Sequence, residues 1–173
     1  MNKLHLYTGE GKGKTTAAMG LALRALGHGR RVLIAQFLKD GKSGEIAALK
    51  QFRGARIARV TPAKKFTFMM TPEELDETRR VHADEVEKLI ELANAEKPRM
   101  LVLDELAMAV YLNVLDETGA TRLIDTALAH GETVVTGRYA PQSIVDRADY
   151  HTEMVKLRHP FDEGLQARPG VEW

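Results

Sequence analysis

The segment YTGEGKGKTTAA near the amino end restricts the fold of this 173-residue chain more than any other part of it. It holds three alternate glycines, then a lysine and a threonine: Gly9, Gly11, Gly13, Lys14 and Thr15. Closely spaced glycines let a backbone curl with its amide hydrogens pointing inward, which makes a cradle for an anion. A helix that begins directly behind the loop adds the positive end of its dipole. The segment therefore predicts a strand, a phosphate-binding turn and a helix in succession.

Four short apolar runs, separated by helical patterns, predict the strands of a sheet. They cover residues 4–7, 32–37, 100–103 and 133–135. Near-continuous apolar runs of this length fit strands buried on both faces of a parallel sheet. The stretch KTTAAMGLALRALGHG between the first two runs is apolar on nearly every side. It predicts a helix sandwiched in the interior and ended by glycine.

Further helical patterns place helices on both faces of this mostly parallel sheet. Thr71 and Pro72 predict the start of a long amphipathic helix, which stops before Pro98. Between residues 38 and 70 we expect a polar loop, then a helix over residues 46–52 and a short strand in ARIARV. The pattern as a whole predicts an α/β fold similar to that of P-loop NTPases.

The length of the chain suits one domain, and no repeat or linker divides it. We therefore expect residues 1–173 to form a single domain, with the tail after Tyr150 packed on it. The formal net charge is only +1, so nothing in the composition favours nucleic acid or a membrane surface as partner. There is no cysteine, and the first residues lack the pattern of a signal peptide. We expect a cytoplasmic protein.

Side chains around the glycine loop predict the chemistry of the anion. Lys14 is placed to reach the outer phosphates of a nucleotide, and Lys12 adds a second positive charge. The hydroxyl of Thr15 is placed to join the coordination shell of Mg²⁺, or of Mn²⁺. The alternative is a glycine-rich turn that binds nothing.

Two further segments end at the same predicted edge of the sheet. MLVLDEL carries Asp104 and Glu105 directly after a buried strand, where one carboxylate can hold Mg²⁺ and the other can orient it. The alternative is a pair of acids that caps the next helix. TVVTGRYAPQ brings Arg138 to this edge, and its guanidinium suits phosphate oxygens, although an ordinary surface ion pair is an alternative.

Several ordered blocks resemble the P-loop corrinoid adenosyltransferases over nearly the whole chain. They are TGEGKGKTTAAMGLALRALGHG, QFLKDGKSGE, LVLDELAMA, TGRYAPQSIVDRADYHTEM and RHPFDEGLQARPGVEW. Thr8 stands where the usual phosphate-loop motif has its first glycine, and this is also the pattern of the family. The resemblance implies catalytic roles for Lys14, Thr15, Glu105 and Arg138, and a metal site at Thr15, Glu105 and Asp104. It implies ATP contacts at Thr8, Gly9, Glu10, Gly11, Lys12, Gly13, Lys14, Thr15, Thr16 and Arg138.

The family resemblance also implies the reaction and its partners. A corrinoid such as cobalamin or cobinamide, reduced to Co(I), attacks the 5′ carbon of ATP and expels inorganic triphosphate. Because Co(I) is the nucleophile, the protein needs no Ser, Cys or His base. The resemblance implies a flavoprotein as electron donor and a homodimer as the assembly.

The segment KKFTFMMTP resembles the family stretch that approaches the lower face of the corrin. It makes Phe66 and Phe68 the candidate corrinoid contacts, since apolar rings exclude water and discourage an axial ligand. The alternative is that Phe66, Phe68 and the two methionines after them form core or a dimer contact.

Two other functions use the same glycine loop. One is phosphoryl transfer, as in a nucleoside kinase or an ATPase. The other is a non-catalytic, nucleotide-switched carrier of a corrinoid. The residues alone predict a nucleoside triphosphate with Mg²⁺, and the family resemblance favours adenosyl transfer.

Overall fold

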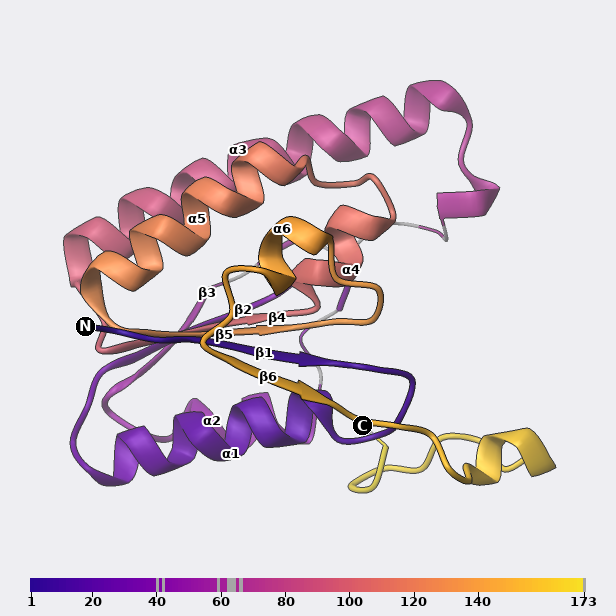
Figure 1. Ribbon diagram of the computed structural model, residues 1–173, viewed down its shortest axis with the longest axis horizontal. Coiled ribbons are helices and arrows are strands. Elements are labelled where there is room, and N and C mark those ends of the chain that lie inside the picture. The colour runs from indigo at the N-terminus through magenta and orange to yellow at the C-terminus, as the bar shows by residue number, and fades with distance from the viewer. Residues whose placement is uncertain (40, 42, 59, 62–64, 66, 173) are drawn as a thin grey trace.

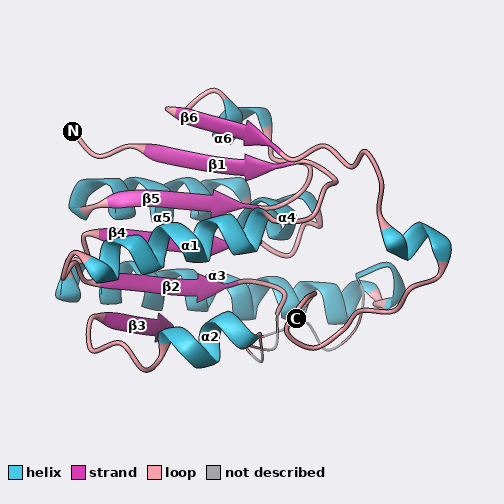
Figure 2. Cartoon of the chain, turned by 90° about the horizontal axis from the view of Figure 1, so that it is seen from below, coloured by secondary structure: helices cyan, strands magenta, loops and turns pink. Residues whose placement is uncertain are grey.

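The computed structural model describes residues 1–39, 41, 43–58, 60–61, 65 and 67–172. Its six-stranded sheet has the order β3-β2-β4-β5-β1-β6, and every pairing among the described residues is parallel (Figure 2). The strands are β1 (Leu4–Thr8), β2 (Val32–Gln36), β3 (Ala55–Ala58), β4 (Met100–Asp104), β5 (Glu132–Thr136) and β6 (Tyr150–Glu153). The predicted α/β fold of the P-loop NTPase type is confirmed.

Helices cover both faces of the sheet (Figure 1). One face carries α1 (Lys14–Gly27) and α2 (Gly44–Leu49); the other carries α3 (Pro72–Glu96), α4 (Leu106–Tyr111), α5 (Glu117–His130) and α6 (Gln142–Val145). Two short 3₁₀ helices lie at Thr67–Met69 and Pro160–Glu163. Among the described helices, none is both long and apolar enough to cross a bilayer.

The core is two apolar layers divided by the sheet. In β2, Leu33 and Ala35 join the layer under α3 and α5, whereas Val32 and Ile34 join the layer under α1 and α2. This alternation follows from the two-residue period of a strand. All five residues of β2 and of β4 are buried, as predicted for central strands of a parallel sheet.

Helix α1 is less buried than we predicted. Its buried side chains form one stripe that faces the sheet, and they include Ala18, Ala22 and Leu26. On the opposite side Gly20 is exposed, and 47% of Leu23 is exposed to solvent. The interior position that we predicted is therefore wrong, because no described helix covers the outer side of α1.

Helix α3 begins and ends where the sequence predicts. The Thr71 hydroxyl accepts a hydrogen bond from the amide of Glu74, and the Glu74 side chain accepts one from the amide of Thr71. Lys97 then takes a left-handed conformation before Pro98. The helix packs along α5, and His82, Val86, Leu89 and Ala93 are its buried residues.

Strand β6 is an element that the apolar pattern did not reveal. All four of its residues, YHTE, are exposed at the edge of the sheet, so they carry no apolar run. β6 pairs with β1 alone, in parallel. Beyond it the tail extends away from the sheet and then returns toward the pocket described below (Figure 1). The tail packs on the domain through β6, through Met154 beside the glycine loop, and through His159 and the last described residues, which line the pocket.

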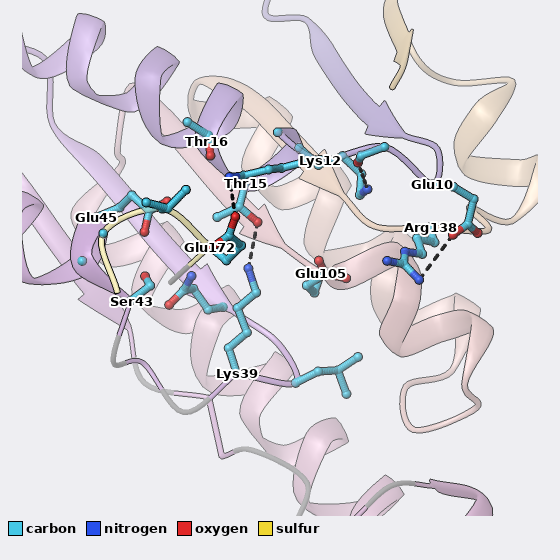
Figure 3. Close-up of a pocket in the computed structure, with 18 of the residues that line it drawn as sticks. Glu10, Lys12, Thr15, Thr16, Lys39, Ser43, Glu45, Glu105, Arg138 and Glu172 are labelled. Carbon is cyan, nitrogen blue, oxygen red and sulfur yellow. Dashed lines mark hydrogen bonds and ion pairs between the residues drawn. The ribbon is translucent and has the colours of Figure 1, made fainter. Parts of the chain in front are cut away.

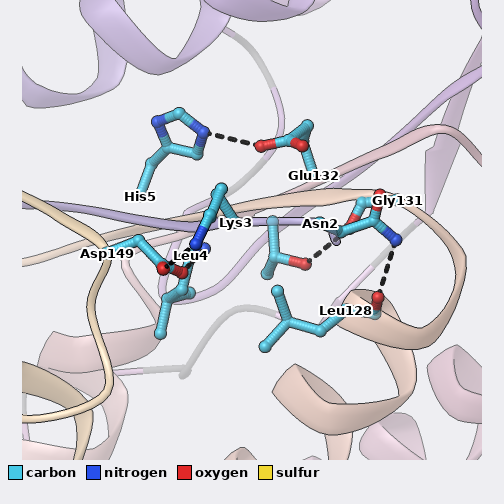
Figure 4. Close-up of polar contacts among 9 residues, drawn as sticks. Asn2, Lys3, Leu4, His5, Leu128, Gly131, Glu132 and Asp149 are labelled. Carbon is cyan, nitrogen blue, oxygen red and sulfur yellow. Dashed lines mark hydrogen bonds and ion pairs between the residues drawn. The ribbon is translucent and has the colours of Figure 1, made fainter.

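Polar contacts tie the starts of β1, β5 and β6 together at the amino edge of the sheet (Figure 4). Lys3 Nζ lies 2.6 Å from Asp149 Oδ1, and His5 Nε2 lies 3.0 Å from Glu132 Oε2. The His5 ring stacks on Tyr150 at a centroid distance of 4.6 Å. These contacts fix the register of β1 at the end of the sheet opposite to the glycine loop.

Candidate functional site

A pocket of about 1250 Å³ lies at the carboxyl edge of the sheet (Figure 3). This is the edge at which open parallel α/β sheets bind ligands. Side chains from the β1–α1 loop, the segment between β2 and α2, the end of β4, the end of β5 and the chain terminus line it. The lining residues are Glu10–Thr16, Gln36, Leu38, Lys39, Gly41, Ser43–Glu45, Glu105, Arg138, His159 and Gly170–Glu172.

The β1–α1 loop needs glycine for two reasons: the backbone conformation of the turn, and the close approach of the residue that follows β6. Gly9 and Gly13 have φ values of 95° and 117°, which favour glycine. A Cβ atom on Gly9 would lie 2.4 Å from the Met154 carbonyl oxygen, and one on Gly11 would lie 2.7 Å from it. The loop therefore packs backbone to backbone against the residue that follows β6.

One loop amide does not point inward as predicted. The N–H of Gly11 donates to the Met154 carbonyl at 2.6 Å, so it is directed at β6 rather than at an anion. Our expectation for this amide was wrong, because the polar residues of β6 gave no signal of a strand beside the loop. Thr8, below the loop, is buried, and its hydroxyl lies 2.8 Å from His151 Nε2.

Lys14 is buried within the loop and closes it. Its Nζ donates to the carbonyl oxygens of Gly9 at 2.6 Å and Gly11 at 2.8 Å. Burial lowers the pKa of this ammonium, and the nearby positive charge of Arg138 lowers it further. To reach a phosphate, the ammonium must exchange these two carbonyls for ligand oxygens.

Asp104 is the centre of a buried polar network. Its side chain has no exposed surface, and both carboxylate oxygens accept hydrogen bonds. Oδ1 accepts from the hydroxyls of Thr15 at 2.9 Å and Thr136 at 2.7 Å, and Oδ2 accepts from Gln36 Nε2 at 2.9 Å and Lys39 Nζ at 2.7 Å. The network brings the predicted pair Thr15 and Asp104 together.

Three members of this network were not predicted: Gln36, Lys39 and Thr136. A signal was available, because Gln36 and Thr136 are polar residues at the carboxyl ends of apolar strands. In a parallel sheet such residues meet at one edge. Lys39 lies three positions after Gln36, in a polar loop, where nothing local distinguishes it from a solvated lysine.

The donor set around Lys39 fits a divalent cation. The Thr15 hydroxyl oxygen and Asp104 Oδ2 each lie 2.7 Å from Lys39 Nζ, so an ammonium already stands between two oxygen ligands. Figure 3 shows the contact of Lys39 with Thr15. Hydroxyl and carboxylate oxygens are the ligands that Mg²⁺ prefers. Within the described residues, no three His, Asp or Glu side chains gather as a metal site, so phosphate oxygens or water must complete the shell.

Glu105 lies in the pocket wall beside this network. It has a left-handed backbone, with φ of 62°, at the start of α4, and its N–H donates to the Thr136 hydroxyl at 2.9 Å. Burial raises the pKa of its carboxyl group, and the charge of Asp104 raises it further. A cation in the pocket would favour the ionised form of Glu105.

Arg138 and Glu10 face each other across the pocket mouth (Figure 3). Arg138 Nη1 lies 3.3 Å from Glu10 Oε2, and both side chains are about half exposed. A hydrogen bond from Tyr139 lowers the pKa of Glu10, and the charge of Arg138 contributes. Gly137 precedes the arginine with φ of 146°, and a Cβ there would lie 2.6 Å from the Met108 amide nitrogen. The guanidinium therefore stands at a tightly packed turn.

The chain terminus contributes a wall that we did not predict. Glu172 Oε1 lies 3.3 Å from Lys12 Nζ. The Arg168 backbone N–H donates to Glu172 Oε2 at 2.9 Å, and its guanidinium lies 3.1 Å from Oε1. These bonds from Arg168, aided by Lys12, lower the pKa of Glu172 to about 2. The Glu172 carboxylate is therefore ion-paired with Lys12, one of the two lysines of the loop.

Phe68, one of the two candidate corrinoid residues, is not among the residues that line the pocket. Phe68 belongs to the 3₁₀ helix Thr67–Met69, and 83% of its surface is exposed. Met69 is 59% exposed, so the alternative that these two side chains form core is wrong. Phe66 lies outside the described residues.

Comparison with known proteins gives a consistent result along the chain. The family described as ATP:corrinoid adenosyltransferase BtuR/CobO/CobP matches residues 1–173. A corrinoid adenosyltransferase of Sinorhizobium sp is 34% identical over 96% of this chain and 78% of its own length. One from Pseudomonas aeruginosa is 33% identical over 98% and 83%. Corrinoid adenosyltransferase CobA of Salmonella typhimurium is 32% identical over 97% and 84%.

Proposed function

The chain belongs to the ATP:corrinoid adenosyltransferase family, and from this membership we propose how its pocket performs the reaction. The enzyme transfers the 5′-deoxyadenosyl group of ATP to a Co(I) corrinoid. The cobalt electron pair forms the new bond to C5′, the bond between C5′ and its oxygen breaks, and inorganic triphosphate leaves with that electron pair. Cobalt ends as Co(III).

The assignment of residue roles rests on four cationic side chains that line one pocket. Lys12, Lys14, Lys39 and Arg138 all line it. Negative charge grows on the triphosphate as the C5′–O bond breaks, so fixed cations around it lower the barrier. The reaction needs alignment and charge stabilisation, and it does not need an acid–base triad in the protein.

Lys14 and Arg138 act on the triphosphate in this proposal. The Lys14 ammonium exchanges the carbonyls of Gly9 and Gly11 for phosphate oxygens. Arg138 exchanges Glu10 for a phosphate, which its planar guanidinium binds with two parallel hydrogen bonds. The position of both side chains in the pocket lining supports these roles.

Thr15, Asp104 and Glu105 hold the divalent cation in this proposal, Mg²⁺ or Mn²⁺. When bound, such a cation neutralises phosphate charge and fixes the geometry of the leaving group. Thr15 and Asp104 supply oxygens that already share one cationic partner, and Glu105 faces the same pocket. The remaining loop residues, Thr8 to Gly13 and Thr16, shape the phosphate site.

Phe68 is proposed as a corrinoid contact, together with Phe66. An exposed ring beside a bound corrin excludes water from its lower face, which makes the cobalt easier to reduce. The exposure of Phe68 supports a surface role of this kind. A flavoprotein electron donor, a homodimer and a cytoplasmic location complete the proposal, and the family resemblance is their support.

Product analysis tests the assignment directly. Protein, Mg-ATP and chemically reduced cobalamin are incubated without oxygen, and the products are separated by chromatography. We expect inorganic triphosphate together with a light-sensitive alkylcobalt product. ADP and phosphate would instead indicate phosphoryl transfer, and binding of both substrates without turnover would indicate a carrier. Either outcome contradicts the proposal.

A further inference from the structure

Lys39 lines the pocket with the other cations, but the reaction scheme above does not explain why its ammonium stands at the position proposed for the metal. Its Nζ lies 2.7 Å from both the Thr15 hydroxyl oxygen and Asp104 Oδ2. The side chain of Lys39 is 31% exposed, whereas that of Asp104 is 0% exposed. The ammonium therefore reaches from the pocket margin down to a carboxylate that has no contact with solvent.

The buried carboxylate needs a positive charge beside it. An ionised carboxylate removed from water is strongly destabilising unless it is paired and hydrogen-bonded. Thr15, Thr136 and Gln36 supply only neutral donors to Asp104. Within the described residues, the cation bonded to Asp104 is Lys39.

A divalent ion and this ammonium cannot share the position. Both need the same two oxygens, and two cations a few ångströms apart repel each other. Lys39 can leave, because its loop follows the end of β2 and its side chain already borders the pocket. The Leu38 backbone, with φ of 58°, marks the turn that brings the lysine over Thr15.

We propose that Lys39 is the resident counter-cation of the metal position, which it fills in the nucleotide-free enzyme and vacates when the metal enters with ATP. The inference rests on the proposed function for the identity of the incoming metal nucleotide. Lys39 is a positioning residue. It keeps Thr15 and Asp104 in place, and it lowers the affinity of the enzyme for the metal ion when no nucleotide is present. Once displaced, its ammonium faces the pocket that receives the triphosphate.

Binding of Mn²⁺ alone tests the competition. Nucleotide-free protein is stripped with a chelator and titrated with Mn²⁺, and the free ion is measured by electron paramagnetic resonance. Removal of the competing charge in Lys39→Met should tighten Mn²⁺ binding by about tenfold or more. Lys50→Met, at an exposed lysine after α2, should bind like the wild type. Unchanged or weaker binding in Lys39→Met overturns the proposal.

A double variant locates the tightened site. In Lys39→Met with Asp104→Asn, the carboxylate is absent, and the gain in Mn²⁺ affinity should disappear. Persistence of the gain would place the metal elsewhere and overturn the proposal. Lys39→Arg keeps a charge at this position, so its Mn²⁺ affinity should stay close to that of the wild type.

Thermal unfolding provides a readout independent of metal affinity. In chelator, Lys39→Met should unfold at a lower temperature than the wild type, because Asp104 loses its only bonded cation among the described residues. Added Mn²⁺ should raise the Tm of Lys39→Met more than that of the wild type. Equal Tm values with equal responses to Mn²⁺ overturn the proposal. Neither assay contains nucleotide or corrinoid. Their results therefore test the role of Lys39 even if the protein does not catalyse adenosyl transfer.

Discussion

Lys14 closes the glycine loop through two hydrogen bonds to loop carbonyls. In the proposed reaction these bonds are exchanged for phosphate oxygens, so loss of Lys14 should lower the reaction rate more than the stability of the fold. We expect Lys14→Ala to lower kcat/KM by about 10²- to 10³-fold, as for loss of one fixed donor to a developing charge. Circular dichroism should show unchanged helix content. Wild-type turnover would contradict the assignment, and Lys50→Ala is the matched control.

Asp104 and Glu105 are adjacent carboxylates with different environments, and their variants should separate the two roles. Asp104→Asn places an amide against the donors Gln36 and Lys39, so we expect a loss of about 1–3 kcal/mol in the free energy of unfolding. Glu105→Gln removes a carboxyl whose pKa burial raises, so it should cost little stability.

Both variants should raise the Mg²⁺ concentration needed for half-maximal activity, with the larger shift in Asp104→Asn. Urea denaturation and a metal titration of the transfer rate measure the two effects. A Glu105→Gln enzyme with a wild-type metal profile would remove Glu105 from the site.

For single residues, the polar side chains at the ends of apolar strands could be predicted from the sequence, but the residues that contact them could not. Glu105 and Arg138 follow such strands and line one pocket, and Asp104, the last residue of β4, is hydrogen-bonded to Thr15 in the pocket wall. Lys39 lies in a loop, and its contact with Asp104 spans 65 positions of the chain. Only tertiary packing selects that lysine from the other lysines of the chain.

At the level of elements, local chemistry predicted α3 better than α1. The capping box and the proline at the first turn set the start of α3 without help from tertiary contacts. In α1 the low polarity of the sequence predicts an interior helix, but Gly20, Leu23 and Arg24 are exposed because no described helix covers that side. β6 could not be predicted because an edge strand whose four residues are all exposed has no apolar period.

The contact between the glycine loop and β6 makes a prediction at this scale. A methyl group on Gly11 would meet the Met154 carbonyl oxygen at 2.7 Å, and backbone atoms cannot easily withdraw. We expect Gly11→Ala to cost about 1–3 kcal/mol in the free energy of unfolding, and to weaken ATP binding. Calorimetry of unfolding and of nucleotide binding measures both.

Gly20→Ala provides the control, since its Cβ would meet no atom within 4 Å. Gly20 lies within α1, where alanine is the better helix former, and the variant should gain about 0.5–1 kcal/mol. If Gly11→Ala proved as harmless as Gly20→Ala, the packing argument would be wrong.

For the whole molecule, the returning tail joins the carboxyl end of the chain to the loop near its amino end. Glu172 forms an ion pair with Lys12, and under the proposed function it would compete there with phosphate. Because exposed ion pairs are weak, we expect Glu172→Gln to lower the KM for ATP by no more than about fivefold. Steady-state kinetics measure it, and Glu163→Gln, on the exposed 3₁₀ helix of the tail, is the control. A higher KM would instead mean that the tail assists binding.

The tail contact should also depend on pH. The folded-state pKa of Glu172 is about 2, below its ordinary value of 4.5, so the native state binds fewer protons than the unfolded state. The contribution of this contact is therefore complete above pH 4.5 and declines as pH falls toward 2. Hydrogen exchange of the tail amides, corrected for intrinsic rates, should show the loss of protection in that window. Equal protection in Glu172→Gln would contradict it.

The place of β1 in the sheet has a consequence for the order in which the protein acquires its shape during translation. β1 leaves the ribosome first, yet its two neighbours are β5 and β6, the last strands to be made. Until residue 154 emerges, Gly11 has no carbonyl to receive its amide hydrogen. A nascent chain halted before Tyr150 should therefore carry the complete glycine motif and still fail to retain ATP.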